Sequence, residues 1–345
     1  MSSEEPHLFR LPRPLRLESG AALPRVEVTY HTYGRLNAAR DNVVWVCHAL
    51  TANADVLSWW PGLFGAGCHF DPADWFIVCA NVLGSCYGTT GPLTPDPLTE
   101  HLAYQHFPLL TIRDMVAAHE ALREHLALTS VHTLIGGSLG GQQAVEWAVQ
   151  RPELFENLVL LATSARHSAW GIAFNEAQRL AIFADPTYET ATPTGGATGL
   201  RAARAVALLS YRSPDAYDRT QTDPDESKLD DYLASSYQRY QGDKLVARFN
   251  AYSYVTLSRA MDSHNVGRRR GGVAAALGRI RARTLVVGIS SDVLFPPQEQ
   301  QLLARHIRGA MYAEMDSHFG HDGFLIETAQ ITQFLERFYV QSYVH

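Results

Sequence analysis

The chain has 345 residues, of which 46% are hydrophobic and 19% charged, and its formal net charge is −6 at pH 7. This length favours one main domain with an insertion, and the ordinary acidic balance argues against a nucleic-acid-binding protein. Residues 1–20 have no apolar segment behind their charges, and no run approaches the roughly 18 apolar residues of a membrane span. We therefore expect a protein that is neither secreted nor membrane-bound and that acts on a small molecule.

The cysteines and histidines indicate the redox state of the protein and whether it binds a metal. None of the four cysteines forms a C-x-x-C pair, and Cys47 and Cys79 lie in apolar, strand-like runs, where buried free thiols are common. We expect them to be reduced and the protein to be cytoplasmic. The chain has no H-E-x-x-H motif and no Cys/His cluster, so we expect no metal centre.

The first part of the chain alternates between strand-like and helix-like patterns. Residues 26–33 alternate like a half-exposed strand, which suits an antiparallel edge. Continuous apolar runs at 42–47 and 75–80 are typical of buried strands, and each ends in a polar or glycine-rich loop. Residues 111–128 repeat apolar side chains at helical spacing and predict a helix.

Ser138 lies between a short apolar run and a helical pattern, in the sequence Gly-Gly-Ser-Leu-Gly-Gly. This G-x-S-x-G pattern is typical of a nucleophile elbow, where a strained serine stands between a strand and a helix that approach closely through small residues. The hydroxyl would be exposed at a helix N-terminus, which favours developing negative charge. The alternative is a glycine-rich turn with an incidental serine.

Two further apolar runs, at 158–162 and 283–289, read as buried strands. Such runs alternating with helices predict a parallel sheet covered on both faces. Between them lie four helical patterns, at 170–183, 199–211, 228–240 and 244–261. 

We therefore expect a core formed by 1–165 and 283–345, with a helical lid at 166–282. An insertion between late strands would lie over the carboxyl ends of the sheet, where open α/β folds bind ligands. The alternative is a helical appendage that serves only for association.

Asp292 follows the strand at 283–289 and is the candidate acid of a catalytic triad. In α/β-hydrolases the triad residues follow in the order Ser, Asp or Glu, His, and an acid at this strand end can accept the imidazole N–H and fix its tautomer. The alternative is a helix N-cap, supported by Pro296 and Pro297 close behind.

Two histidines compete for the role of base after a last short strand at 311–315. We prefer His321, which follows a glycine in the loop that opens a terminal helix at 324–343, to His318. His48 and the surface-looking His119 and His306 are interpreted as hydrogen-bonded or solvated.

Motifs along residues 17–339 together resemble the homoserine O-acetyltransferase family. They are His48-Ala49-Leu50-Thr51, Asn81-Val82-Leu83-Gly84 with Cys86-Tyr87-Gly88 and Thr90-Gly91-Pro92, Thr111-Ile112-Arg113-Asp114, the elbow followed by Ala144-Val145-Glu146-Trp147, Tyr240-Gln241-Gly242-Asp243-Lys244 with Arg248-Phe249, and Gly320-His321-Asp322-Gly323-Phe324-Leu325. The resemblance implies an α/β-hydrolase fold with a mainly parallel sheet and an inserted helical lid, usually in a homodimer that associates through lid helices. It implies transfer of acetyl from acetyl-CoA to the hydroxyl of L-homoserine, a step towards methionine, with no permanently bound cofactor.

The resemblance also implies roles for single residues. Ser138 is the nucleophile, Asp292 and His321 complete the triad, and Arg204 and Asp322 contact homoserine. A zwitterionic amino acid needs a fixed cation and a fixed anion, which this last pair would supply. Without the resemblance, Arg204 reads equally well as a solvated lid arginine.

The remaining expectations concern the oxyanion and the acyl donor. We expect the backbone N–H groups of Leu139 and Leu50 to hold the oxyanion. Relatives that use succinyl-CoA tend to carry an arginine where Leu294 stands, and a leucine offers no partner for a buried carboxylate, which favours acetyl. Residues 268–270 are three arginines that read as a solvated face rather than as a coenzyme A contact. A homoserine O-succinyltransferase, a serine O-acyltransferase and an esterase with the same triad remain as alternatives.

Overall fold

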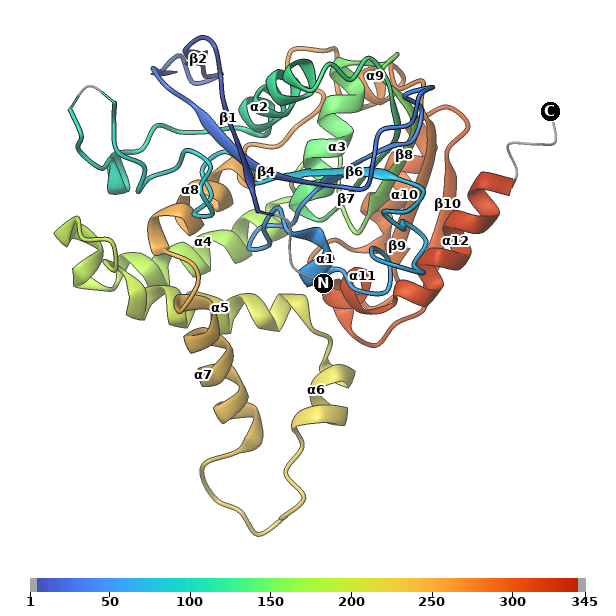
Figure 1. Cartoon of the computed structure of the whole chain (residues 1–345). Coiled ribbons are helices and arrows are strands. Elements are labelled where there is room, and N and C mark those ends of the chain that lie inside the picture. The colour runs from blue at the N-terminus through green and yellow to red at the C-terminus, as the bar shows by residue number, and fades with distance from the viewer. Residues whose placement is uncertain (1–4, 98, 341–345) are drawn as a thin grey trace.

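The fold is built around a mostly parallel sheet of eight strands (Figure 1). The computed structural model describes residues 5–97 and 99–340. In spatial order the strands are β1 (His7–Arg10), β4 (Glu27–Tyr33), β6 (Phe76–Ala80), β5 (Val43–Cys47), β7 (Val131–Gly137), β8 (Phe155–Leu161), β9 (Arg283–Ile289) and β10 (Met311–Met315). The strands from β6 to β10 are parallel, whereas β4 is antiparallel to both of its neighbours. The predicted antiparallel strand therefore forms, but β1 rather than β4 is the edge.

The parallel strands from β6 to β9 are buried on both faces, as their continuous apolar runs predict, whereas β10 at the edge of the sheet is only partly buried. In β5, Trp45 and Cys47 belong to one buried cluster and Val44 and Val46 to another, because successive side chains point to opposite faces. The first cluster includes residues of α2 (Ile112–His125), α3 (Leu139–Gln150) and α10 (Pro297–His306). The second includes residues of α1 (Val56–Trp59), α11 (Gly323–Ile326) and α12 (Thr328–Val340).

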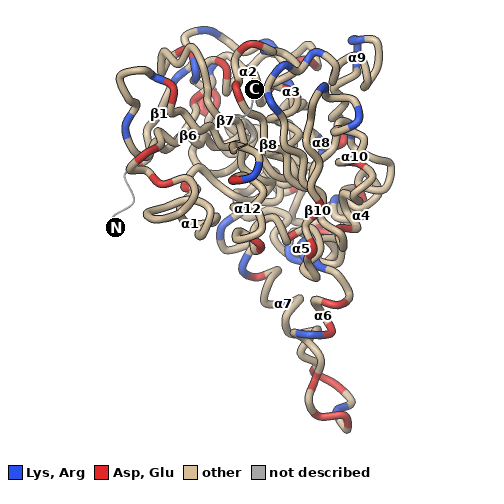
Figure 2. The backbone as a smooth tube through the Cα atoms, turned by 90° about the vertical axis from the view of Figure 1, so that its right-hand side faces the viewer, with Lys and Arg blue, Asp and Glu red and all other residues tan. Residues whose placement is uncertain are grey.

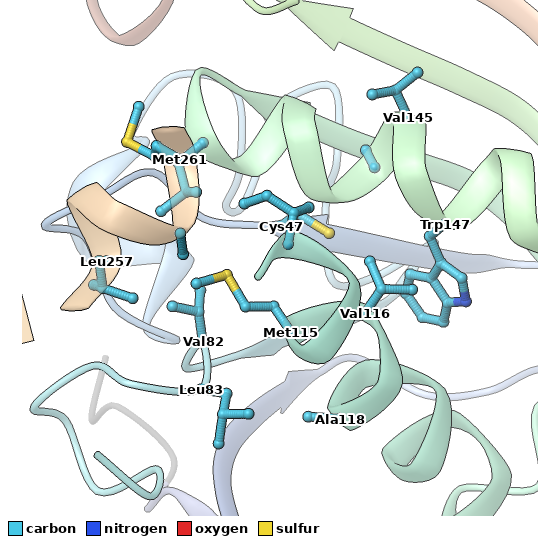
Figure 3. Close-up of a cluster of buried hydrophobic side chains, with 14 of the residues drawn as sticks. Cys47, Val82, Leu83, Met115, Val116, Ala118, Val145, Trp147, Leu257 and Met261 are labelled. Carbon is cyan, nitrogen blue, oxygen red and sulfur yellow. The ribbon is translucent and has the colours of Figure 1, made fainter. Parts of the chain in front are cut away.

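The segment between β8 and β9 is helical. It comprises α4 (Ala169–Phe183), the short 3-10 helix η2 (Pro186–Thr190), α5 (Ala197–Tyr211), α6 (Pro214–Gln221), α7 (Leu233–Val246), α8 (Ala251–Asp262) and α9 (Val273–Leu277). Side chains of α8 pack into the first cluster, and Figure 3 shows Leu257 and Met261 beside Met115 of α2 and Cys47 of β5. In contrast, α6 and α7 project from the body, joined by a loop rich in acidic residues (Figure 2). The division into a core and a lid at residues 166 and 282 stays a prediction.

The smaller elements lie around this framework. They are the hairpin of β2 (Leu15–Arg16) and β3 (Ala22–Leu23) and two further 3-10 helices, η1 (Tyr104–His106) and η3 (Gly320–Asp322). None of the helices in the described part of the chain is long and apolar enough to cross a membrane. All four cysteines are free thiols.

The element boundaries differ from the predictions where caps interrupt an apolar pattern. The predicted helix at 244–261 is wrong, because Asn250 caps the start of α8 by accepting the Ser253 N–H at 2.8 Å, and Lys244 belongs to α7. Helix α6 was missed, although Ser213 and Pro214 form an ordinary helix start. The predicted terminal helix breaks at Glu327 into α11 and α12, and its last residues, 341–343, lie outside the described residues.

Candidate active site

Ser138 stands at the turn from β7 to α3 with a strained backbone, as its sequence context predicts. Its φ of 56° and ψ of −125° lie outside the regions that an L-residue prefers. The flanking glycines are required sterically. A Cβ on Gly136 would lie 2.4 Å from the carbonyl oxygen of Gly140, and a Cβ on Gly140 would lie 1.9 Å from that of Cys47.

We expect Gly140→Ala to lower the free energy of unfolding by about 3 kcal/mol, because the added methyl group meets backbone that cannot move aside. Chemical denaturation would measure the effect. Gly278→Ala is the matched control, since a Cβ there finds its nearest atom at 3.4 Å. Equal stability of the two variants would contradict the steric argument.

Ser138, His321 and Asp292 form one hydrogen-bonded chain. The Nε2 atom of His321 lies 2.8 Å from Ser138 Oγ, and its Nδ1 atom lies 2.6 Å from Asp292 Oδ2. All three residues are buried. In the neutral imidazole, these partners fit the tautomer that donates its Nδ1–H to the carboxylate and accepts the serine proton at Nε2. The arrangement can therefore activate the serine as a nucleophile.

Neighbouring groups hold this chain in place. The other oxygen of Asp292, Oδ1, accepts the N–H groups of Leu294 at 2.8 Å and Phe295 at 2.9 Å. The carboxylate therefore stabilises the turn that directly follows it. It is not the N-cap of α10, because that position is held by Pro296. The His321 ring packs between aromatic rings, with centroids 5.1 Å from Phe295 and 5.5 Å from Phe324. 

His318 lies outside this hydrogen-bonded chain. Its ring packs on Phe319 with centroids 4.0 Å apart, and its carbonyl oxygen accepts the Ser213 hydroxyl.

Leu50 lines the same cavity as Ser138, and Leu139 follows Ser138 directly in the chain. Leu139 is the first residue of α3, and Leu50 follows β5. Within the described residues neither N–H has a hydrogen-bond partner, so both are available to an oxyanion. The loop of Leu50 is held by His48, whose ring bonds to the Ala49 carbonyl at 2.8 Å and accepts the Val82 N–H at 3.0 Å. Burial lowers the pKa of His48 to about 4, so the imidazole that holds this loop is neutral at pH 7.

A cavity of about 440 Å³ opens above the serine. Its walls include Ser138, His321, Arg204, Asp322 and Tyr211. The structure therefore brings Ser138 and His321 together with both residues expected to contact an amino acid.

Arg204 and Asp322 have neighbours that sequence reasoning missed. The Arg204 guanidinium lies over the Tyr211 ring, 5.3 Å from its centroid, and its Nε atom is buried with no hydrogen-bond partner among the described residues. Arg212 Nε lies 2.9 Å from Asp322 Oδ2. Burial raises the pKa of the Asp322 carboxyl, while the charges of Arg212 and Arg204 act against that rise. Arg204 and Tyr211 are seven residues apart and therefore lie on one face of a helix, and this spacing could have predicted their contact from the sequence.

Leu294 does not line this cavity as far as the structure describes it. Its side chain is buried in the first core cluster, and its backbone N–H donates to Asp292 Oδ1 at 2.8 Å. A role in the choice of acyl donor therefore stays a prediction.

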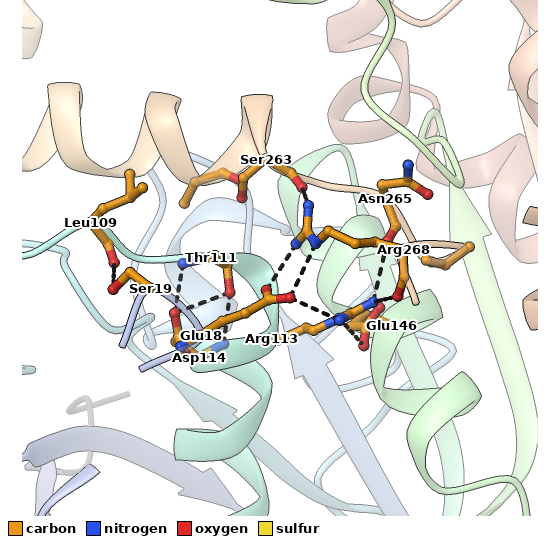
Figure 4. A network of polar contacts seen from close by, with 12 residues as sticks. Glu18, Ser19, Leu109, Thr111, Arg113, Asp114, Glu146, Ser263, Asn265 and Arg268 are labelled. Carbon is orange, nitrogen blue, oxygen red and sulfur yellow. Dashed lines mark hydrogen bonds and ion pairs between the residues drawn. The ribbon is translucent and has the colours of Figure 1, made fainter. Parts of the chain in front are cut away.

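Of the arginines at 268–270, Arg269 is exposed as expected from the charge run, but Arg268 and Arg270 do not belong to a solvated face. Arg268 pairs with Glu18 at 2.8 Å, and Arg270 pairs with Glu146 at 2.6 Å. Arg113 joins both acids in one network, which ties the N-terminal segment to α2 and α3 (Figure 4). The charge run did not predict these ion pairs, because the carboxylates of Glu18 and Glu146 come from distant parts of the chain.

His119 is buried and not at the surface as expected. Its Nε2 atom lies 2.8 Å from Gln143 Oε1, and its ring stacks on Trp147 because this face of α2 packs against α3. In residues 5–97 and 99–340, no three His, Cys, Asp or Glu side chains are placed to hold a metal ion.

Known proteins resemble this chain over almost its whole length. The α/β hydrolase fold family matches residues 42–328. A homoserine O-acetyltransferase from Cyclobacterium marinum is 46% identical over 99% of this chain and 99% of its own. The solved structure of a homoserine O-acetyltransferase from Staphylococcus aureus is 31% identical, with a TM-score of 0.80 over 96% of this chain and 95% of that one.

The same fold also occurs in hydrolases. The crystal structure of esterase E22 superimposes with a TM-score of 0.88 over 97% of this chain and 99% of that one, but at 21% identity, and this likeness shows the fold alone. The family is shown by the identity of the closer relatives over nearly their full length. The chain therefore belongs to the homoserine O-acetyltransferase family, on the α/β-hydrolase fold.

Proposed function

We propose that this protein transfers acetyl from acetyl-CoA to the side-chain hydroxyl of L-homoserine through an acetyl-Ser138 intermediate. The observation that carries the proposal is the cavity above the triad serine, whose wall includes both a cation, Arg204, and an anion, Asp322. A simple ester needs neither charge, whereas a zwitterionic amino acid needs both. 

In the first half-reaction, Ser138 Oγ attacks the thioester carbonyl while His321 Nε2 takes its proton. Asp292 stabilises the imidazolium that forms, and the N–H groups of Leu50 and Leu139 hold the oxyanion. When the tetrahedral intermediate collapses, the carbon–sulfur bond breaks and His321 gives its proton to the leaving thiolate. The acetyl group is then bonded to Ser138 Oγ, and coenzyme A leaves with a free thiol.

In the second half-reaction, His321 takes the proton of the homoserine hydroxyl as that oxygen attacks the acetyl carbon. The bond to Ser138 Oγ breaks, the proton returns to Ser138, and O-acetyl-L-homoserine leaves. Arg204 binds the homoserine carboxylate with a guanidinium fork, and Asp322 binds the ammonium group. The lid helices exclude water, so the acetyl group goes to homoserine instead of being hydrolysed.

Release of coenzyme A with and without homoserine tests the proposal. We expect fast steady-state release only with L-homoserine, together with O-acetyl-L-homoserine as the product. An esterase would release coenzyme A at the same rate without the acceptor. Replacing homoserine by serine, and acetyl-CoA by succinyl-CoA, separates the remaining alternatives.

We also propose that the chain is a cytoplasmic homodimer that associates through its lid. Helix α4 exposes Trp170, Leu180 and Phe183, whose exposed fractions are 55%, 59% and 39%. Large apolar side chains exposed along one helix are typical of association sites. Light scattering in solution would test the dimer.

We expect Leu294→Arg to shift the donor preference from acetyl-CoA towards succinyl-CoA, because a guanidinium would give the succinyl carboxylate a partner. The measurement is the ratio of kcat/KM for the two donors. Leu294→Met keeps the volume without adding charge and serves as the control. A ratio that is the same in both variants would count against this role.

A further inference from the structure

Two cations, Lys244 near the end of α7 and Arg248 just beyond it, line the mouth of the cavity. Both are exposed, whereas Ser138 in the same cavity is buried. Among the described residues, neither cation has a carboxylate partner, and the neighbouring Asp243 is neutralised by Arg201 at 2.7 Å. Their charges are therefore available to a ligand.

Arg248 is held in a fixed orientation. Its Nη1 atom donates to Tyr87 Oη at 2.6 Å and also to the Thr51 carbonyl, while Nη2 lies 3.4 Å from Thr51 Oγ1. These contacts occupy the Nη1 side of the guanidinium and leave the edge formed by Nε–H and Nη2–H. Two parallel N–H groups on a preorganised edge are a bidentate donor for phosphate.

The charges of the cavity do not balance for homoserine alone. The charged side chains of its walls are three cations, Arg204, Lys244 and Arg248, and one anion, Asp322. A zwitterionic acceptor is matched by Arg204 and Asp322, and Arg212, which pairs with Asp322 at 2.9 Å, only adds positive charge. Lys244 and Arg248 are therefore left as excess cations in a chain whose net charge is −6. A local positive region on an acidic protein attracts an anionic ligand. The second substrate, a coenzyme A thioester, is such an anion.

We propose that Lys244 and Arg248 bind phosphate groups of the acyl donor at the cavity mouth while its thioester reaches Ser138. The proposal rests on the proposed function, because it assigns a binding site to that reaction's donor. Since the phosphates do not change during acetyl transfer, these contacts act equally on the ground state and the transition state. Their loss raises KM for the donor and leaves kcat unchanged.

Lys244→Met, which removes the charge and keeps the length of the side chain, tests the proposal with two donors. Acetyl-CoA carries the phosphates, and S-acetyl-N-acetylcysteamine carries the same thioester without them. We expect the variant to raise KM for acetyl-CoA about tenfold or more, with kcat and the kinetics of the phosphate-free donor unchanged. Lys244→Arg should restore most of the affinity for acetyl-CoA.

Arg239→Met is the matched control, because Arg239 lies on the same helix but pairs with Asp231 outside the cavity. We expect its kinetics to equal those of the wild type with both donors. Arg248 is less suited to this test, since its contacts with Thr51 also support the loop of Leu50.

Two results would overturn the phosphate site: an unchanged KM for acetyl-CoA in Lys244→Met, or an equal loss with both donors. A failure of the proposed function is distinct, because the wild type would then transfer acetyl from neither donor to homoserine. Acetyl transfer by the wild type is therefore measured first, and its absence would contradict both the proposed function and the phosphate site.

Discussion

Ser138→Ala is expected to lower kcat for acetyl transfer by about 10⁶-fold, the loss seen when a triad nucleophile is removed from a serine protease. The substitution removes the Oγ atom, which lies 2.8 Å from His321 Nε2. Mass spectrometry after incubation with acetyl-CoA alone should show one covalent acetyl group on the wild type and none on the variant.

Ser58→Ala is the matched control for this experiment. Ser58 borders the same cavity, but its hydroxyl donates to the Asp55 carbonyl at 2.7 Å. We expect this variant to retain the acetyl adduct. An acetyl adduct that persists on Ser138→Ala would show that another residue is the nucleophile, and the proposed two-step mechanism would fail.

Asp292→Asn is expected to lower kcat by about 10⁴-fold with little change in fold, as in the equivalent serine protease variant. Asp292 Oδ2 accepts the Nδ1–H of His321, and an amide NH₂ in its place would favour the other tautomer. With the proton on Nε2, His321 could no longer accept a proton from Ser138. Steady-state release of coenzyme A measures the effect, and thermal unfolding checks the fold.

Asp215→Asn is the control for this second variant. Asp215 forms an exposed pair with Arg219 on α6, and such pairs contribute little to stability or activity. We expect activity within about twofold of the wild type. If Asp292→Asn retained a similar activity, the carboxylate would not set the tautomer of His321.

Local patterns predicted the elements that carry the chemistry. The buried strand β9 was predicted with its observed bounds, since a continuous apolar run between polar ends is a property of neighbouring residues. The strained turn at Ser138 was also predictable, because the need for glycine at Gly136 follows from the approach of β7 to the helix that comes directly after it. The need for glycine at Gly140 has a second cause, since a Cβ there would meet the Cys47 carbonyl of β5.

Pairings between distant segments were not predictable in this way. The charge run at 268–270 gave no sign that Arg268 bonds to Glu18, 250 residues away. His119 looked exposed because one polar residue in a helical pattern does not reveal which neighbour covers it. The pairing of Arg212 with Asp322 was not predicted either, because these two residues are far apart in the sequence.

By itself the sequence determined the fold class, the family and the three residues proposed as the triad, because strand runs, a steric motif and the chain order of the triad are linear features. Only the tertiary structure decided how these residues meet. It brought His321 between Ser138 and Asp292, paired Asp322 with Arg212, and left Lys244 and Arg248 without carboxylate partners within the described residues. Hydrogen bonds and ion pairs act over a few ångströms in space, and separation along the chain does not set those distances.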